Sequence, residues 1–239
     1  VIGTEYACIM ATLGVRVTLI EGKNLILGLA GSNTGTGTIH VNGNAFTFNG
    51  LLKDDATAGS SGKLIKTGSQ VLALGSGNSY TGGTDLNAGK IQLNASGVLP
   101  DVGTVTIASG ATLNMNFQNE TIGALAGAGT VTSEGGSGGV FTLTVGGGDG
   151  SGSFNGTLQN GAFVRQLGLA KIGAGTQTLA AGGTYTYSGP TTVTAGTLRV
   201  DGSATASTFT VESGGTLGGT GSVGAVNVQG ALAPGNSTG

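Results

Sequence analysis

The chain has 239 residues, a net charge of −2 and only 8% charged residues, whereas 51 residues are glycine. Without any basic cluster it is a poor partner for nucleic acid or an anionic membrane surface, since both attract patches rich in Lys and Arg. The hydrophobic fraction of 38% excludes the composition of a disordered chain, so we expect glycine to separate folded elements. The single cysteine, Cys8, excludes an internal disulfide.

The first 23 residues differ in pattern from the rest, and we predict two parts, 1–23 and a repeat domain over 24–239. Thr4 to Leu13 is predicted to form a short helix, and Val15 to Ile20 a strand. Residues 1–22 resemble a fragment of the nicotinamide-binding segment of soluble pyridine nucleotide transhydrogenase-like flavoproteins. The resemblance implies that Gly3 is the last glycine of the fingerprint and Glu21 the acidic residue on a ribose.

This fragment lacks the first strand and the first two glycines of that fingerprint, so no pyrophosphate site can be built. We therefore expect no cofactor. The piece is interpreted as a cap on one end of a β-structure or as foreign sequence. The chain starts without Met and ends without a recognisable terminus, which we interpret as the mark of a fragment.

From residue 24 on, short segments carry apolar residues two apart, which is the period of a strand with one buried face. Gly-Gly, Asn-Gly and Ser-Gly turns separate them, at spacings of about ten residues or fewer. The predicted strands are Thr38–Val41, Phe46–Phe48, Val71–Leu74, Ile91–Leu93, Val105–Ile107, Thr142–Val145, Thr192–Thr194, Leu198–Val200, Phe209–Val211 and Val226–Val228.

Three all-β architectures compete: a sandwich, a propeller and a right-handed parallel β-helix. A sandwich favours more aromatic residues than the 5% present, and no Trp-Asp blade signature of a propeller occurs. A solenoid, in contrast, can fill its interior with small apolar residues and turn its corners with glycine. We predict the right-handed parallel β-helix, with roughly nine or ten rungs of ~20–25 residues.

A long-range echo supports a repetitive fold. Segments within residues 46–115 return within residues 152–217, with an offset of the matched positions between 104 and 107. Lys66-Thr67-Gly68, for example, returns as Lys171-Ile172-Gly173. Such a repeat is typical of stacked structural units.

The ordered pattern within the echo resembles the autotransporter-associated β-strand repeat over most of residues 37–237. The segments that carry the resemblance are Gly62–Gly68, Val71–Leu74, Asn78–Thr84 and Asn87–Ile91, with a second copy from Leu169 to Leu198. The resemblance implies a secreted, surface-displayed bacterial passenger, carried outward by an outer-membrane β-barrel in a missing part of the protein. Family members share a stalk rather than one activity, and they include adhesins.

Ionisable groups are few, and we assign no catalytic, cofactor-binding or metal-ligating residue. His40, the only histidine, is predicted to face solvent from a strand, and one Cys with one His cannot complete a zinc site. Asp149 lies in a glycine-rich segment similar to a calcium-binding nonapeptide, yet the motif does not recur, so a turn is favoured. Paired threonines at 104/106, 130/132, 142/144 and 208/210 are ascribed to strand propensity rather than to an ice-binding ladder.

The leading hypothesis is a noncatalytic extracellular stalk or adhesin-type passenger segment, monomeric, whose partners are surface glycans or proteins. The alternative is a β-helix that binds or cleaves polysaccharide. It requires charged residues to converge across rungs, and the residues to locate are Asp54, Asp55, Asp85, Lys63, Lys66 and Lys90. A third hypothesis, a nicotinamide-linked oxidoreductase remnant, depends only on residues 1–22.

Overall fold

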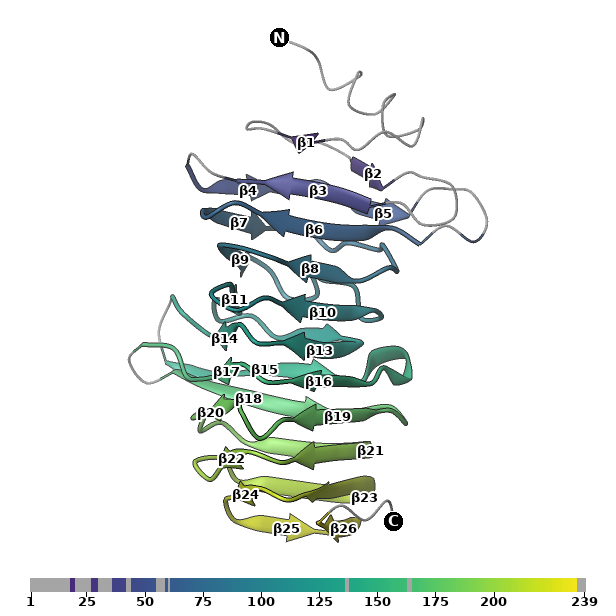
Figure 1. Cartoon of the computed structure of the whole chain (residues 1–239), viewed down its shortest axis with the longest axis vertical. Coiled ribbons are helices and arrows are strands. Elements are labelled where there is room, and N and C mark those ends of the chain that lie inside the picture. The colour runs from purple at the N-terminus through teal and green to yellow at the C-terminus, as the bar shows by residue number, and fades with distance from the viewer. Residues whose placement is uncertain are drawn as a thin grey trace.

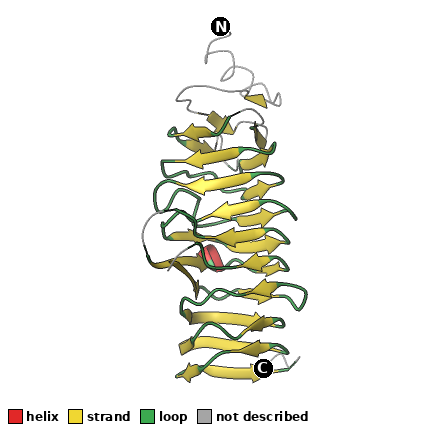
Figure 2. Cartoon of the chain, turned by 90° about the vertical axis from the view of Figure 1, so that its left-hand side faces the viewer, coloured by secondary structure: helices red, strands yellow, loops and turns green. Residues whose placement is uncertain are grey.

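A computed structural model describes residues 18–19, 27–29, 36–41, 44–54, 59, 61–135, 138–162 and 165–235. These residues form a parallel β-solenoid whose rungs are stacked along one axis, from the N-terminal end at the top of Figure 1 to the C-terminal end at the bottom. The same stack is seen from the side in Figure 2. The predicted all-β parallel β-helix is confirmed, and the ten predicted strands all lie in or overlap strands of the structure.

Each rung passes three faces in the same order, which we call faces 1, 2 and 3. Face 1 consists of β1 (Thr18–Leu19), β3 (Thr36–His40), β6 (Lys63–Thr67), β8 (Thr84–Leu86), β10 (Thr104–Ile107), β13 (Ala124–Gly127), β16 (Gly152–Phe154), β19 (Thr176–Leu179), the second halves of β21 (Thr191–Val200) and β23 (Phe209–Gly219), and β26 (Ala231–Pro234). Face 2 consists of β4 (Phe46–Phe48), β7 (Val71–Leu74), β9 (Lys90–Leu93), β11 (Thr112–Asn114), β14 (Thr130–Thr132), β17 (Thr157–Leu158) and β20 (Thr184–Tyr185), followed by the pair β22 (Ser203–Ala204) and β24 (Ser222–Val223).

Face 3 is less regular. It begins with the pair β2 (Leu27–Leu29) and β5 (Leu52–Asp54) and resumes with β12 (Glu120–Ile122), β15 (Gly139–Val145), β18 (Arg165–Lys171), the first halves of β21 and β23, and β25 (Val226–Val228). A 3-10 turn, η1 (Gly147–Asp149), joins β15 to β16, so Asp149 lies in a turn, as predicted.

The core is a set of inward rows, each made by one residue per rung. On face 2, the register places one after another Leu72, Ile91, Leu113, Val131, Leu158 and Tyr185, all of them buried. In β9 buried and partly exposed residues alternate, as expected of a strand with one buried face, whereas in β11 Asn114 after Leu113 is buried as well. Small and medium apolar side chains therefore suffice to fill the interior.

The rungs are less uniform than predicted. Leu217 and its partner Leu232 are separated by 15 residues, whereas Gly127 and its partner Phe154 are separated by 27. Ten strands nevertheless follow one another on face 1 from β3 to β26, so the number of rungs agrees with the nine or ten predicted.

The predicted helix at Thr4 to Leu13 lies outside the described residues, as do Gly3, Cys8 and Glu21. Thr18 and Leu19 pair in parallel with Thr38 and Ile39 of β3, so this part of the predicted strand belongs to the solenoid stack. The division at residue 23 stays a prediction.

Replacing Leu113 by Ala tests the core row. We expect the free energy of unfolding to fall by about 3 kcal/mol, because the side chain is fully buried between two rungs and its loss leaves a cavity. The control is Leu51→Ala, since Leu51 is 38% exposed and its truncation should cost less than about 1 kcal/mol. Urea denaturation followed by circular dichroism measures both, and equal losses would contradict the assignment of the core.

Candidate functional site

A buried lysine closes one corner of the solenoid. Lys66 at the end of β6 is fully buried, and its Nζ donates hydrogen bonds to the carbonyl oxygens of Thr67 (2.7 Å), Gly68 (2.8 Å) and Ala88 (3.1 Å). Two of these carbonyls belong to its own corner and the third to the next rung. Burial lowers the pKa of Lys66 to about 8. The lysine thus supplies donors to carbonyl groups at the turn, among which the Thr67 carbonyl also accepts a backbone hydrogen bond from Val41 N (3.1 Å).

The same arrangement recurs at Lys171 in β18. Its Nζ donates to the carbonyl oxygens of Ile172 (2.5 Å), Gly173 (2.8 Å) and Ala195 (3.2 Å), and burial lowers its pKa, with the charge of Asp149 opposing the shift. We call these two arrangements the lysine clamps. In each, the glycine after the clamp has positive φ, 80° at Gly68 and 66° at Gly173, and a Cβ there would clash with a backbone carbonyl oxygen of the rung before.

A buried tyrosine accompanies each clamp. The hydroxyl groups of Tyr80 and Thr84 lie 2.6 Å apart, and those of Tyr187 and Thr191 lie 2.8 Å apart. Both tyrosines are fully buried, and burial raises the pKa of Tyr187 to about 12. The hydrogen bond gives each phenol a partner inside the core, which a buried polar group requires. In both copies a lysine clamp and a tyrosine pair thus lie at opposite ends of the same face, and we call the two together a corner module.

The two copies of the module occupy different faces. Lys66 lies in β6 on face 1, whereas Lys171 lies in β18 on face 3. The second copy is thus displaced around the solenoid by one face, although its local hydrogen bonds are the same. The repeat seen in the sequence therefore does not correspond to a whole number of rungs of the solenoid.

A row of side chains replaces the missing strands of face 3. Asn78 accepts a hydrogen bond from Leu52 N (2.7 Å) through its Oδ1 and donates to Val98 O (2.7 Å) through its Nδ2. Glu120 of β12 then accepts from Val98 N (3.0 Å) and Leu99 N (3.1 Å). This side-chain spine connects the rungs over 75–83 and 94–103, where the described backbone forms only the single bridge between Lys53 and Ser79 on this face.

Glu120 is only 2% exposed, and burial raises its pKa to about 7 although the two backbone N–H donors favour its charged form. Among the described carboxyl groups, Glu120 is the one whose pKa is raised above its ordinary value. Sequence reasoning missed it, because Asn119-Glu120-Thr121 has no motif that distinguishes a buried carboxylate from an exposed one.

The charged residues chosen as discriminators do not gather in one groove. Lys63 pairs with Asp85 (3.1 Å) on the outside of face 1, and Lys90 pairs with Glu134 on the outside of face 2. Lys66 is enclosed in its clamp. Asp54 accepts hydrogen bonds from Gly62 N (2.6 Å) and from the backbone and hydroxyl of Thr81 (3.0 and 2.7 Å), so it connects the rungs of a corner.

Asp55 and the side chain of His40 lie outside the described residues, and the predicted orientation of His40 stays a prediction. Within the described part of the chain, no group of three or more His, Cys, Asp or Glu side chains is placed to hold a metal ion. No helix in that part is long and apolar enough to cross a membrane. The four threonine pairs are distributed over all three faces and do not form one ladder.

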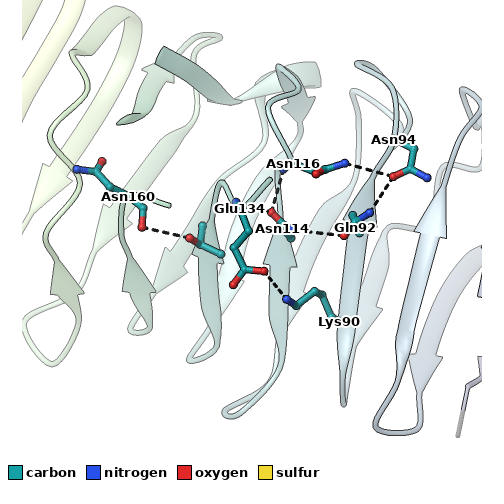
Figure 3. Close-up of polar contacts among 8 residues, drawn as sticks. Lys90, Gln92, Asn94, Asn114, Asn116, Glu134 and Asn160 are labelled. Atoms are coloured by element: carbon teal, nitrogen blue, oxygen red, sulfur yellow. Dashed lines mark hydrogen bonds and ion pairs between the residues drawn. The ribbon is translucent and has the colours of Figure 1, made fainter. Parts of the chain in front are cut away.

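Face 2 carries a strip of polar side chains on its outer surface, shown in Figure 3. Asn114 Nδ2 lies 3.4 Å from Gln92 Oε1, and Asn114 Oδ1 accepts hydrogen bonds from Asn116 N (2.9 Å) and Glu134 N (2.8 Å). Asn94 Oδ1 accepts from Gln92 Nε2 (3.0 Å) and Asn116 Nδ2 (3.3 Å). Neighbouring rungs are thus bound through amides, and the strip holds its side chains in fixed orientations.

Fold and corners together define a parallel β-solenoid with recurring corner modules. Residues 64–93 and 169–200, which contain the two modules, match the passenger-associated-transport-repeat family. The chain therefore matches this autotransporter repeat twice, and the predicted resemblance is confirmed for these two segments. The comparisons give no support to the flavoprotein resemblance of residues 1–22.

Two relatives are similar over part of their length. The chain is 35% identical over 169 residues to the adhesin BmaC autotransporter of Brucella suis biovar 1 (strain 1330), which is 69% of this chain and 5% of that protein. It is 47% identical over 74 residues to an extracellular serine protease of Serratia marcescens, which is 30% of this chain and 7% of that protein. The chain thus spans only a small part of either relative. No solved structure matches it.

Replacing Lys66 by Met tests the clamp. We expect the free energy of unfolding to fall by about 2–4 kcal/mol, because the aliphatic stem is kept while buried carbonyl groups lose their donor. Lys171→Met should have a similar effect. The matched control is Lys63→Met, three residues away, since its partly exposed pair with Asp85 is worth less than about 1 kcal/mol. If Lys63→Met is as destabilising as Lys66→Met in urea denaturation, the clamp has no special role.

Glu120 predicts a pH dependence of stability. Its pKa is raised from 4.5 to about 7 in the folded chain, so the unfolded chain releases this proton first as pH rises. We therefore expect the contribution of Glu120 to the free energy of unfolding to be greatest below pH 4.5 and to fall between pH 4.5 and 7, by at most about 3 kcal/mol. In Glu120→Gln that fall should disappear. Urea titrations of both proteins from pH 4 to 8 measure the difference, and parallel profiles would refute it.

Proposed function

We propose that this chain is a noncatalytic, rod-like segment of a surface-displayed bacterial passenger of the adhesin type. The observation that carries the proposal is the use of its ionisable groups. Lys66 and Lys171 close corners, Asp54 and Glu120 connect rungs, and the Lys63–Asp85 and Lys90–Glu134 pairs neutralise each other. Only 8% of the residues are charged, and those named above stabilise the solenoid itself. Such a chain is suited to presenting surface loops rather than to acid–base catalysis.

The two repeat copies and the relative named as an adhesin support the surface location and the adhesive role. The relative named as a serine protease matches over 74 residues only, and its activity belongs to that protein. Rungs that share inward rows resist local opening, because each rung is stabilised mainly by its two neighbours. Such a rod would hold loops away from the cell.

Antibodies against the purified chain test the location. We expect them to label intact source cells, and an in-frame deletion of residues 44–235 should abolish the label and reduce adherence to epithelial monolayers or glass. Complementation with the full gene is the control and should restore both. Labelling that requires permeabilised cells would overturn the proposal, and undiminished adherence of the deletion strain would overturn its adhesive part.

A further inference from the structure

The corner between β11 and β12 is strained. Asn116 and Phe117 have φ of 44° and 55°, and Asp149 is the only other described non-glycine residue with positive φ. The left-handed region is unfavourable for a bulky residue such as Phe117, and such a conformation persists only where surrounding contacts hold it. Here Asn116 N donates to Asn114 Oδ1 (2.9 Å), Asn116 Nδ2 to Leu93 O (2.9 Å), and Phe117 N to Ser133 Oγ (3.2 Å).

This backbone conformation places the ring of Phe117 at the surface. Phe117 is 37% exposed, although the core beneath is already filled by buried Met115 and Leu113. A second ring, Phe141 of β15, meets it edge to face with centroids 6.3 Å apart, and Val140 beside it is 43% exposed. Gly135 lies close against the Phe117 ring, since a Cβ there would come within 2.8 Å of Phe117 Cε1. The corner therefore fixes a rigid apolar patch that the fold itself does not need.

Oriented polar groups lie next to this patch. Ser96 Oγ donates to Gln118 Oε1 (3.1 Å) and accepts from Asn119 N (3.2 Å), while Asn119 Oδ1 accepts from Thr142 N (2.9 Å). The exposed Asn94 has its Oδ1 occupied by Gln92 and Asn116, so its two N–H donors are directed to solvent. Lys90 and Glu134, the charged residues of the adjoining strip, neutralise each other. The surface is thus apolar and amide-rich, without net charge.

We propose that this corner binds uncharged sugar residues of a glycan. We call it the Phe117 corner, and it consists of Asn94, Ser96, Asn116 to Asn119 and Phe141. A pyranose ring has an apolar C–H face, which packs on an aromatic ring, and a rim of hydroxyl groups, which pairs with amide donors and acceptors. The absence of net charge matches a neutral ligand rather than an acidic one. A protein partner fits less well, because a stable protein interface requires about 20–30 residues on each side and this corner offers fewer than ten.

This proposal deepens the adhesive function proposed above and rests on it for its biological setting. The site itself is a property of the purified chain. Direct binding and surface display are therefore separate questions, and one can fail while the other holds.

The test is binding of the purified 239-residue chain to cellohexaose, maltohexaose, xylohexaose and chitohexaose, measured by calorimetry and saturation-transfer NMR, with hexagalacturonate as the acidic probe. We expect at least one neutral probe to bind and hexagalacturonate to bind more weakly. Phe117→Ala should weaken binding about tenfold or more, and Phe117→Tyr should keep it. The matched control is Val102→Ala, which truncates another exposed apolar residue (41%) on a different corner and should leave affinity unchanged.

Circular dichroism and the thermal midpoint verify that each variant is folded, and Asn116→Gly provides a second variant that removes the amide while easing the strain. No binding of any neutral probe, or equal binding by wild type and Phe117→Ala, overturns the proposal even where surface display is established. On host cells, adherence of the chain should be lost after periodate oxidation of glycans. Loss after trypsin but not after periodate would identify a protein partner instead and would also overturn it.

Discussion

Every rung of this chain depends on its neighbours to bury its apolar side chains. A single rung supplies one residue, such as Leu113, to each inward row, and that residue is enclosed only because Ile91 precedes it and Val131 follows it in register. Stability is therefore a sum of contacts between adjacent rungs rather than the property of one central core. The interior accepts a change of length in a corner loop as long as the register of the strands is kept.

The corners impose the second constraint. A backbone that turns sharply between faces leaves N–H and C=O groups outside the ladders, and these groups need partners because they are buried or half-buried. The chain supplies those partners from its few polar residues, with lysines on carbonyl oxygens and carboxylates or amides on N–H groups. Asn78 and Glu120 go further, since they take over the role of a strand where face 3 has none. A few polar and charged side chains are thus enough to give the corner backbone groups their hydrogen-bond partners.

The sequence predicts the strands well, because a period of two with glycine turns depends only on local alternation. It predicts rung length less well, since a loop of any length can close a corner. Lys66 could have been recognised as structural, because Lys171 recurs at the same point of the echo. Glu120 carries no comparable signal, since its backbone partners Val98 and Leu99 lie in the rung before it, where face 3 has no strand. Neither could the left-handed backbone of Asn116 and Phe117 be predicted, since it results from contacts with Leu93 and Ser133 on other rungs.

The displacement of the second corner module from face 1 to face 3 has a consequence for how such rods grow. The two copies are separated by a distance in sequence that is not a whole number of turns, yet each closes its corner with the same bonds. A duplication or deletion within the gene therefore need not begin and end at the same angular position to yield a foldable product. The rod can therefore lengthen or shorten by a third of a turn. Each such change rotates the loops that follow about the long axis, so that the loops after a module can extend from any of the three faces.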